Sequence, residues 1–229
     1  MQEVPSSSHP RLIKVLYEDD FFVAFDKPSG LLVVPTPKKE KNTLVDIADW
    51  QFAAFHDSFH LHPCHRLDRD TSGAILFAKG KKNQQVMAEL FKERKVRKKY
   101  IALVHGAPPL REGELKSAIR DFDQEKFHKN SFAKTAITRY KVIERRSGFS
   151  IVEVSPLTGR TNQIRIQFSE AGFPLVGERK YAFARDFELR FKRAALHASE
   201  LEWFHPFVHK PVKITSPLAK DMAEFIAKH

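Results

Sequence analysis

Short apolar runs bounded by turn residues dominate the pattern of hydrophobic and polar positions along the chain. Runs of this kind, when rich in β-branched and aromatic side chains, are typical of strands. Two of them flank Ser147-Gly148 and predict a hairpin. The expected strands cover residues 12–16, 21–25, 31–34, 74–78, 100–104, 135–143, 149–154, 195–204 and 211–214.

Apolar residues recur at helical spacing in four other segments. Asn42 or Thr43 can cap the first of these segments, and Gly172 is placed to end the third. Ser216 and Pro217 predict the N-cap and the first residue of the last helix. The helices are expected over residues 43–56, 82–94 and 163–171 and after residue 216, with Met222, Phe225 and Ile226 on one face of the last.

The remaining segments show neither the short apolar runs of strands nor the apolar spacing of helices. Residues 1–10 are expected to form a polar tail and residues 60–73 a loop, while residues 111–134 are polar and mixed. Strands therefore run through the whole length with few helices between them, which favours one α+β domain with a mostly antiparallel sheet over residues 11–229. A dinucleotide-binding fold is disfavoured, because no Gly-x-Gly-x-x-Gly is present.

The composition narrows the class of protein. Hydrophobic residues make up 42% of the 229 residues and charged residues 29%, which excludes wholesale disorder. The single cysteine, Cys64, excludes a disulfide scaffold and fits a reducing compartment. The apolar runs are too short to span a membrane, and the N-terminus lacks the apolar stretch of a secretory signal. We therefore expect a soluble cytoplasmic protein.

Positive charge is concentrated in one stretch. The chain carries 39 Lys and Arg against 28 Asp and Glu, a net charge of +11 that suggests a polyanionic partner. Residues 79–99 hold nine of these cations and two glutamates, which supplies +7 of the +11. The stretch is either a solvated helix face whose cations favour the negative helix end or a surface that contacts nucleic-acid phosphates.

The densest group of reactive residues lies between His60 and Gly73, and three interpretations of it are open. A metal site would use His60, His62, Cys64, His65 and Asp68, but the spacing matches no common zinc arrangement. Alternatively, Asp68 is a nucleophile or general base that neighbouring arginines keep ionised. In the third interpretation, Asp68 only bonds to its own turn.

A second polar group follows a predicted strand and opens a predicted helix. Residues 156–165 contain Arg160 and Arg165 among several other hydrogen-bond donors. Such a turn can bind phosphate or carboxylate at a helix start, or it is an ordinary connection. A serine hydrolase is not indicated, because no Gly-x-Ser-x-Gly occurs.

Five short motifs follow one another along the chain. They are Lys27 to Gly30 (KPSG), His65 to Gly73 (HRLDRDTSG), Lys99 to Gly106 (KYIALVHG), Thr158 to Arg165 (TGRTNQIR), and Ala195 to Ala198 (ALHA) with His205-Pro206. Together, and in this order, they resemble the motifs of the RluA-type family of RNA pseudouridine synthases. The resemblance implies one α+β catalytic domain with a central mixed, mostly antiparallel sheet flanked by helices and loops, and an active-site cleft across the sheet.

The resemblance also implies a reaction and roles for single residues. The reaction would be the isomerisation of uridine in ribosomal RNA, transfer RNA or both, without cofactor or metal. Asp68 would be the catalytic aspartate, acting at C6, at C1′ or as a base. Arg165 would pair with Asp68, Tyr100 would pack against the target base and is a candidate for proton abstraction at C5, and Arg66 would fill the gap left by a flipped uridine. With RNA as the polyanion, the concentration of charge and the donor-rich turn, rather than the resemblance, make Arg160, Lys92, Lys95, Arg97 and Lys98 the candidates for RNA binding.

The chain departs from the family at two positions. Asn162 and Gln167 stand where the family usually has histidine, which casts doubt on proton transfer there. We expect no S4-type RNA-binding domain, and a monomer. The competing hypotheses are a catalytically inactive RNA-binding relative, which the presence of Asp68, Tyr100 and Arg165 disfavours, and, more remotely, a metal-dependent hydrolase.

Overall fold

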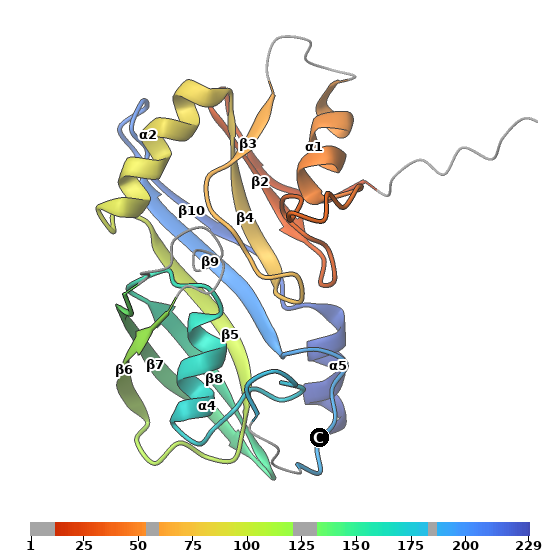
Figure 1. The fold of residues 1–229 in the computed structure, drawn as a ribbon, viewed down its shortest axis with the longest axis vertical. Helices are drawn as coiled ribbons and strands as arrows, with labels where there is room; N and C mark the ends of the chain where they lie inside the picture. The colour runs from red at the N-terminus through yellow and green to blue at the C-terminus, as the bar shows by residue number, and fades with distance from the viewer. Residues whose placement is uncertain (1–11, 54–59, 121–131, 183–186) are drawn as a thin grey trace, which may run out of the picture.

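The computed structural model describes residues 12–53, 60–120, 132–182 and 187–229, in which ten strands form one sheet flanked by helices (Figure 1). The predicted tail at residues 1–10 lies outside the described residues. The strands are β1 (Val15–Glu18), β2 (Phe22–Lys27), β3 (Leu61–Pro63), β4 (Ser72–Lys79), β5 (Arg97–His105), β6 (Glu112–Ile119), β7 (Lys134–Arg146), β8 (Phe149–Pro156), β9 (Leu196–Phe204) and β10 (Pro211–Thr215). The helices are α1 (Leu44–Ala53), α2 (Lys81–Lys92), α4 (Gln163–Glu170) and α5 (Lys220–Lys228).

The sheet runs in the order β1-β2-β4-β9-β5-β8-β7-β6, with β3 beside β4 and β10 beside β9. Within the described residues the pairing is antiparallel except between β4 and β9, so the expected mixed, mostly antiparallel sheet is confirmed. That parallel join consists of Ser72 opposite His197 and Gly73 opposite Ala198. A Cβ atom on Gly73 would collide with the Ala198 carbonyl, so this close approach requires glycine.

Alternation along the strands assigns side chains to the two faces of the sheet. On β2, Val23 and Phe25 belong to a core cluster shared with α1 and α4. Phe22 belongs to a second cluster, on the opposite face, which Met87 of α2 completes. A third cluster packs α5 against β5 and β8 through buried Met222 and Phe225 and half-buried Ile226, as the helical spacing predicts.

The predicted helices form, with boundaries set by local hydrogen bonds. Helix α1 begins after Thr43, whose backbone N–H and hydroxyl both bond the Asp46 carboxylate, at 2.8 and 2.9 Å. The predicted helix extends to residue 56, and its last part, residues 54–56, lies outside the described residues. Helix α4 ends as predicted at Gly172, which has a φ of 88°. The Phe173 N–H then bonds the Phe168 carbonyl at 2.9 Å, which closes a Schellman motif.

The prediction of a strand at residues 31–34 is wrong. Its apolar residues do pack inward, since Val33 is buried, but its carbonyls bond to a helix and not to a sheet. The Leu44 and Val45 N–H groups donate to the carbonyls of Leu32 and Val33 at 2.7 and 3.1 Å. The segment therefore satisfies the free N–H groups at the start of α1.

Two strands lie where none was predicted, and the first strand is displaced. Strand β3 lies inside the predicted loop 60–73, and β6 lies inside the mixed stretch 111–134. Strand β6 is an edge strand with exposed and half-buried side chains in alternation, so polar residues hide its period. The first strand runs from Val15 and not from residue 12.

The predicted start of the last helix is also wrong. Helix α5 begins after Ala219, and Ser216 is not its cap. The Ser216 N–H bonds the Ser199 carbonyl at 2.9 Å, and its hydroxyl donates to the Asp26 carboxylate at 2.8 Å. Ser216 therefore continues the pairing of β10 with β9 and links it to β2.

Among the helices of the described residues, none has the length and apolar character that crossing a membrane requires.

Candidate active site

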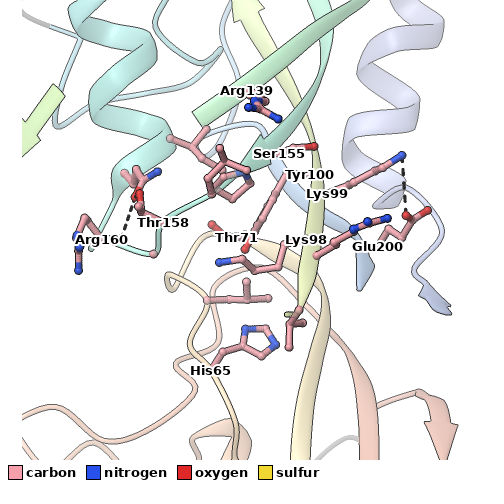
Figure 2. A pocket seen from close by; sticks show the side chains of 18 of the residues that line it. His65, Thr71, Lys98, Lys99, Tyr100, Arg139, Ser155, Thr158, Arg160 and Glu200 are labelled. Carbon is pink, nitrogen blue, oxygen red and sulfur yellow. Dashed lines mark hydrogen bonds and ion pairs between the residues drawn. The ribbon is translucent and has the colours of Figure 1, made fainter. Parts of the chain in front are cut away.

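A cavity of about 1440 Å³ lies where the loop before β4 faces β5, β7 and the turn between β8 and α4 (Figure 2). It brings together most residues that the sequence singled out. Of the residues expected to act in catalysis or RNA binding, Lys95 alone does not line it, and His60 and His62 of the metal interpretation also lie outside it. The candidates in its wall are Arg66, Asp68, Lys92, Arg97, Lys98, Tyr100, Arg160 and Arg165.

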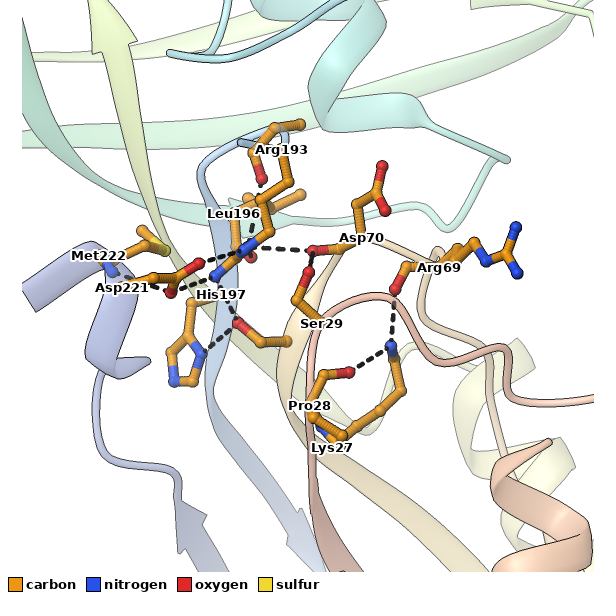
Figure 3. Close-up of polar contacts among 12 residues, drawn as sticks. Lys27, Pro28, Ser29, Arg69, Asp70, Arg193, Leu196, His197, Asp221 and Met222 are labelled. Carbon is orange, nitrogen blue, oxygen red and sulfur yellow. Dashed lines mark hydrogen bonds and ion pairs between the residues drawn. The ribbon is translucent and has the colours of Figure 1, made fainter. Parts of the chain in front are cut away.

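A buried lysine, Lys27, bonds to the backbone of the loop that carries Asp68. Lys27 is fully buried, and its ammonium donates to the carbonyls of Pro28, Leu31 and Arg69 at 3.0, 2.7 and 3.0 Å (Figure 3). Burial, with Arg193 nearby, lowers the pKa of Lys27 to about 7. The segment from Lys27 to Gly30 therefore supports the backbone of the loop that carries Asp68.

The same loop is tied to the C-terminal helix by Arg193. This buried guanidinium bonds both carboxylate oxygens of Asp221 on α5, at 2.8 and 2.9 Å. Its other contacts include the Asp70 carbonyl at 3.0 Å and the Ser72 hydroxyl at 3.1 Å (Figure 3). The Ser29 hydroxyl also donates to the Asp70 carbonyl, at 2.9 Å. The backbone beside Asp68 is thus fixed from two directions.

Asp68 is half-buried in the wall of the cavity, where its surroundings shift the pKa of its carboxyl in opposite directions. Burial raises the pKa of its carboxyl above the ordinary value, and the negative charge of Glu178 acts in the same direction. Arg165, Arg66 and Lys27 oppose this rise by stabilising the carboxylate. Of the two arginines that flank Asp68 in the sequence, Arg66 thus favours the carboxylate. The three cations offset the effect of burial only in part, because the pKa stays above its ordinary value.

Arg165 makes its direct ion pair with Glu178, not with Asp68 as expected. Its Nε and one terminal nitrogen donate to the two Glu178 oxygens at 2.7 and 2.8 Å, and the other donates to Asn162 Oδ1 at 2.9 Å. The guanidinium also lies over the Tyr181 ring, 5.4 Å from its centre. Arg165 therefore acts on Asp68 through space, by lowering the pKa of its carboxyl.

Sequence reasoning missed Glu178, whose side chain is fully buried. Its carboxylate also accepts the backbone N–H of Lys180 at 2.8 Å, so a turn holds it in place for Arg165. The one local signal was the preceding Gly177, which has a φ of 78° and no room for a Cβ against the Arg193 carbonyl. That signal marks a tight backbone, but it does not reveal the pairing.

The two residues that replace the family's histidines have structural contacts. Asn162 precedes α4 with a φ of 54°, a conformation that asparagine tolerates, and accepts the bond from Arg165. Gln167 is buried, and its amide nitrogen donates to the carbonyls of Leu115 on β6 and Ala136 on β7, at 3.1 and 3.0 Å. Amides can serve both positions, because both use hydrogen bonds and not a titrating group.

Tyr100 enters the cavity at an irregularity in the sheet. The pairing of β5 with β9 shifts register between Lys99 and Tyr100, and such bulges re-aim side chains. Burial, together with the charge of Asp68, raises the pKa of the Tyr100 phenol well above its usual range. Tyr100, which faces the cavity (Figure 2), is therefore a neutral phenol within the electrostatic reach of Asp68.

The residues of the metal interpretation have other roles. The Leu76 N–H donates to His65 Nε2 at 3.1 Å, and the ring packs 5.0 Å from that of Phe91. Burial lowers the pKa of His65 to about 3, so the ring is a neutral acceptor, and it raises the pKa of the Cys64 thiol to about 12. In the described parts of the chain, no three His, Cys, Asp or Glu side chains are grouped as metal ligands.

The basic stretch divides into paired and unpaired cations. Lys92 pairs with Glu89 at 3.0 Å and Lys95 with Glu93 at 2.7 Å, and Arg97 lies 3.7 Å from Glu202. Lys98 differs, since no acid in the described residues pairs with it, and it is half-buried facing the opposite wall. A Cβ on Gly159 would lie 3.7 Å from the Lys98 ammonium. Burial lowers the pKa of Lys98, so an incoming anion would find a poorly solvated positive charge.

Known structures place this architecture in one class. The solved structure of human RNA pseudouridylate synthase domain containing 4 superimposes with a TM-score of 0.79 over 93% of this chain and 92% of the other, at 24% identity. Human RNA pseudouridylate synthase domain containing 1 gives 0.71 over 98% and 97%, also at 24% identity. The fold is therefore that of a pseudouridine synthase.

Sequence comparison then identifies the family. The family described as RNA pseudouridylate synthase matches residues 21–170. The dual-specificity RNA pseudouridine synthase RluA of Vibrio cholerae is 36% identical over 86% of this chain and 79% of its own length. YlyB of Bacillus subtilis, described as an uncharacterized RNA pseudouridine synthase, is 33% identical over 96% and 73%. The chain belongs to the RluA-type family of RNA pseudouridine synthases, enzymes that isomerise uridine in RNA.

Proposed function

We propose that the chain isomerises uridines in ribosomal RNA, transfer RNA or both, with Asp68 as the catalytic aspartate. The observation that carries the assignment is the position of Asp68 in the cavity wall, within the field of three cations and within electrostatic reach of the Tyr100 phenol. The substrate class follows the names of relatives. The Vibrio cholerae relative is named a dual-specificity enzyme, and a relative in Xylella fastidiosa, 32% identical, a ribosomal large subunit pseudouridine synthase.

The chemistry requires an extruded nucleotide, because the reacting atoms are inaccessible in a stacked base. Arg66 is exposed two residues before Asp68, where it can enter the gap left by the flipped uridine. The bond between N1 and C1′ breaks, the uracil rotates, and a bond forms between C5 and C1′. The C5 proton is lost to solvent and N1 gains a proton, so the reaction needs no cofactor or metal.

The proposed roles of the side chains follow from their surroundings. An ionised Asp68 serves attack at C6, attack at C1′ and deprotonation alike, and Arg165, Arg66 and Lys27 favour that ionised form. Arg165 is a fixed charge, because Glu178 holds it. For Tyr100 we propose packing against the target base. It is also the candidate for proton abstraction at C5, for which the phenol, neutral because its pKa is raised, would first have to lose its own proton.

For RNA binding we propose Lys98 and Arg160 inside the cleft and Lys92, Lys95 and Arg97 at its outer edge. The Arg160 N–H bonds the Gln163 side chain at 3.0 Å, which sets its loop opposite Lys98. One chain supplies all the proposed site residues, which is compatible with a monomer. An RNA substrate and a single cysteine fit a cytoplasmic enzyme.

Neutralising the basic stretch is expected to weaken RNA binding. In the triple variant Lys95→Gln, Arg97→Gln, Lys98→Met, the plot of log affinity against log salt should become shallower by roughly one to two units, because fewer counterions are released. Lys98→Met alone should produce most of the change, because acids already pair with Lys95 and Arg97. Fluorescence anisotropy with a labelled uridine-containing stem-loop RNA measures this. An unchanged slope in the triple variant would show that the stretch is merely solvated.

Product mapping tests the function directly. We expect a strain that lacks the gene to lose pseudouridine at one or a few positions of ribosomal or transfer RNA, and the purified protein to restore them. Release of tritium from [5-³H]uridine-labelled RNA of that strain follows the reaction in solution. The assignment fails if no position is lost and no tritium is released.

A further inference from the structure

The turn that joins α2 to β5 uses the same hydrogen bonds as the end of α4 but a different residue at the critical position. The Arg94 N–H bonds the Phe91 carbonyl at 3.1 Å, and the Lys95 N–H bonds the Leu90 carbonyl at 2.8 Å. This is a Schellman motif, whose residue after the C-cap adopts the left-handed conformation. At α4 that residue is Gly172, whereas here it is Arg94, with a φ of 60°.

An arginine at this position is a local cost to the fold. Side chains with a Cβ are strained in the left-handed region, and glycine is the usual choice. Residues held in such conformations tend to cluster at functional sites. The left-handed conformation of Arg94 therefore points to a role for its side chain.

The surroundings of Arg94 indicate what that role is. Arg94 is exposed and lines the same cavity as Asp68 and Tyr100. Its neighbours Lys92 and Lys95 pair with Glu89 and Glu93. No acid in the described residues pairs with Arg94, so its full charge faces the cleft.

We propose that Arg94 binds a phosphate of the RNA at the outer edge of the cleft, and that this contact is the reason for a strained arginine at the α2–β5 turn. The inference rests on the proposed RNA substrate and adds a binding residue to it. A guanidinium suits this task because it can donate two hydrogen bonds to one phosphate.

The test measures stability and binding in the same variants. Arg94→Gly should raise the melting temperature by about 2–4 °C, because the strain is removed. It should also weaken binding to a labelled uridine-containing stem-loop RNA by about tenfold and reduce the salt slope by roughly one unit. Arg94→Lys keeps the charge but not the two parallel hydrogen bonds, so it should keep the wild-type salt slope, lose part of the affinity and show no gain in stability.

His209→Gly is the matched control. His209 also has a positive φ, 51°, and is exposed, but it lies in the turn between β9 and β10 and does not line the cavity. This variant should gain stability without losing RNA affinity. The pair of glycine variants therefore separates relief of strain from loss of a phosphate contact.

The two possible failures can be told apart. If Arg94→Gly gains stability but keeps wild-type affinity and salt slope, the Arg94 proposal is overturned and the proposed function is untouched. An Arg94→Gly variant that loses stability overturns it as well. If the wild-type protein neither binds the stem-loop nor releases tritium from uridine-labelled RNA, the proposed function fails, and the Arg94 proposal fails with it.

Discussion

Asp68→Asn is expected to abolish pseudouridine formation while RNA binding persists. The amide keeps the size of the carboxyl group but cannot carry the negative charge that each proposed route requires. The arginines and lysine around position 68 would then face a neutral group. We expect tritium release to fall by roughly a thousandfold or more, the scale seen when an essential catalytic group is removed.

Binding and folding controls make this result specific. The affinity of Asp68→Asn for the stem-loop RNA should stay equal to that of the wild type or increase slightly, because a negative charge beside the phosphates has been removed. Its unfolding midpoint in urea should not decrease, since burying the Asp68 carboxylate is itself costly. A variant that binds RNA and still releases tritium at the wild-type rate would remove Asp68 from the catalytic role.

Arg165→Met is expected to cause the second largest effect, on stability and on activity together. The substitution leaves the Glu178 carboxylate buried without its bidentate partner. Removal of one member of a buried ion pair typically destabilises a protein by about 3–5 kcal/mol. Activity should also be lost, because Asp68 loses the charge that most opposes the effect of burial on its pKa.

The double variant Arg165→Met, Glu178→Met separates the two roles of Arg165. Replacement of both charges by apolar side chains should recover most of the stability, since well-packed apolar residues can substitute for a buried pair. It should not recover the activity, because Asp68 still lacks the positive charge. Urea denaturation and tritium release give the two readouts. If the double variant regained wild-type activity, Arg165 would be needed only as the counter-ion of Glu178.

The parts of the fold that depend on local periodicity could be predicted from the sequence. The apolar runs of β2 and β8 and the helical spacing in α2 and α4 reflect contacts that each segment makes with the core. Strand β6 escaped prediction because its edge position leaves most of its side chains exposed. Ser216 and the segment 31–34 were misassigned because their hydrogen-bond partners, Asp26 and the start of α1, are supplied by tertiary structure.

The candidate site could likewise be predicted from the sequence only as far as it depends on local motifs. Motif order was enough to collect Asp68, Tyr100 and Arg165 as candidates, and the structure places all three in one cavity wall. It was not enough to show that Arg165 bonds Glu178, because that choice depends on a turn after Gly177 that the motifs do not include. A motif therefore predicts which residues meet, but not which pairs bond.

The ties between the catalytic loop and the end of the chain have a consequence for biosynthesis. The Asp70 carbonyl is bonded by Arg193, 123 positions later, and Arg193 is itself held by Asp221. Contacts this distant in sequence form late, because a long loop must close before they stabilise anything. During translation the segment around Asp68 is made first, and its supports at Arg193 and Asp221 are made more than a hundred residues later. A nascent chain on the ribosome would thus acquire its finished catalytic loop only after Asp221 has been added, so immature chains would have little capacity to modify RNA.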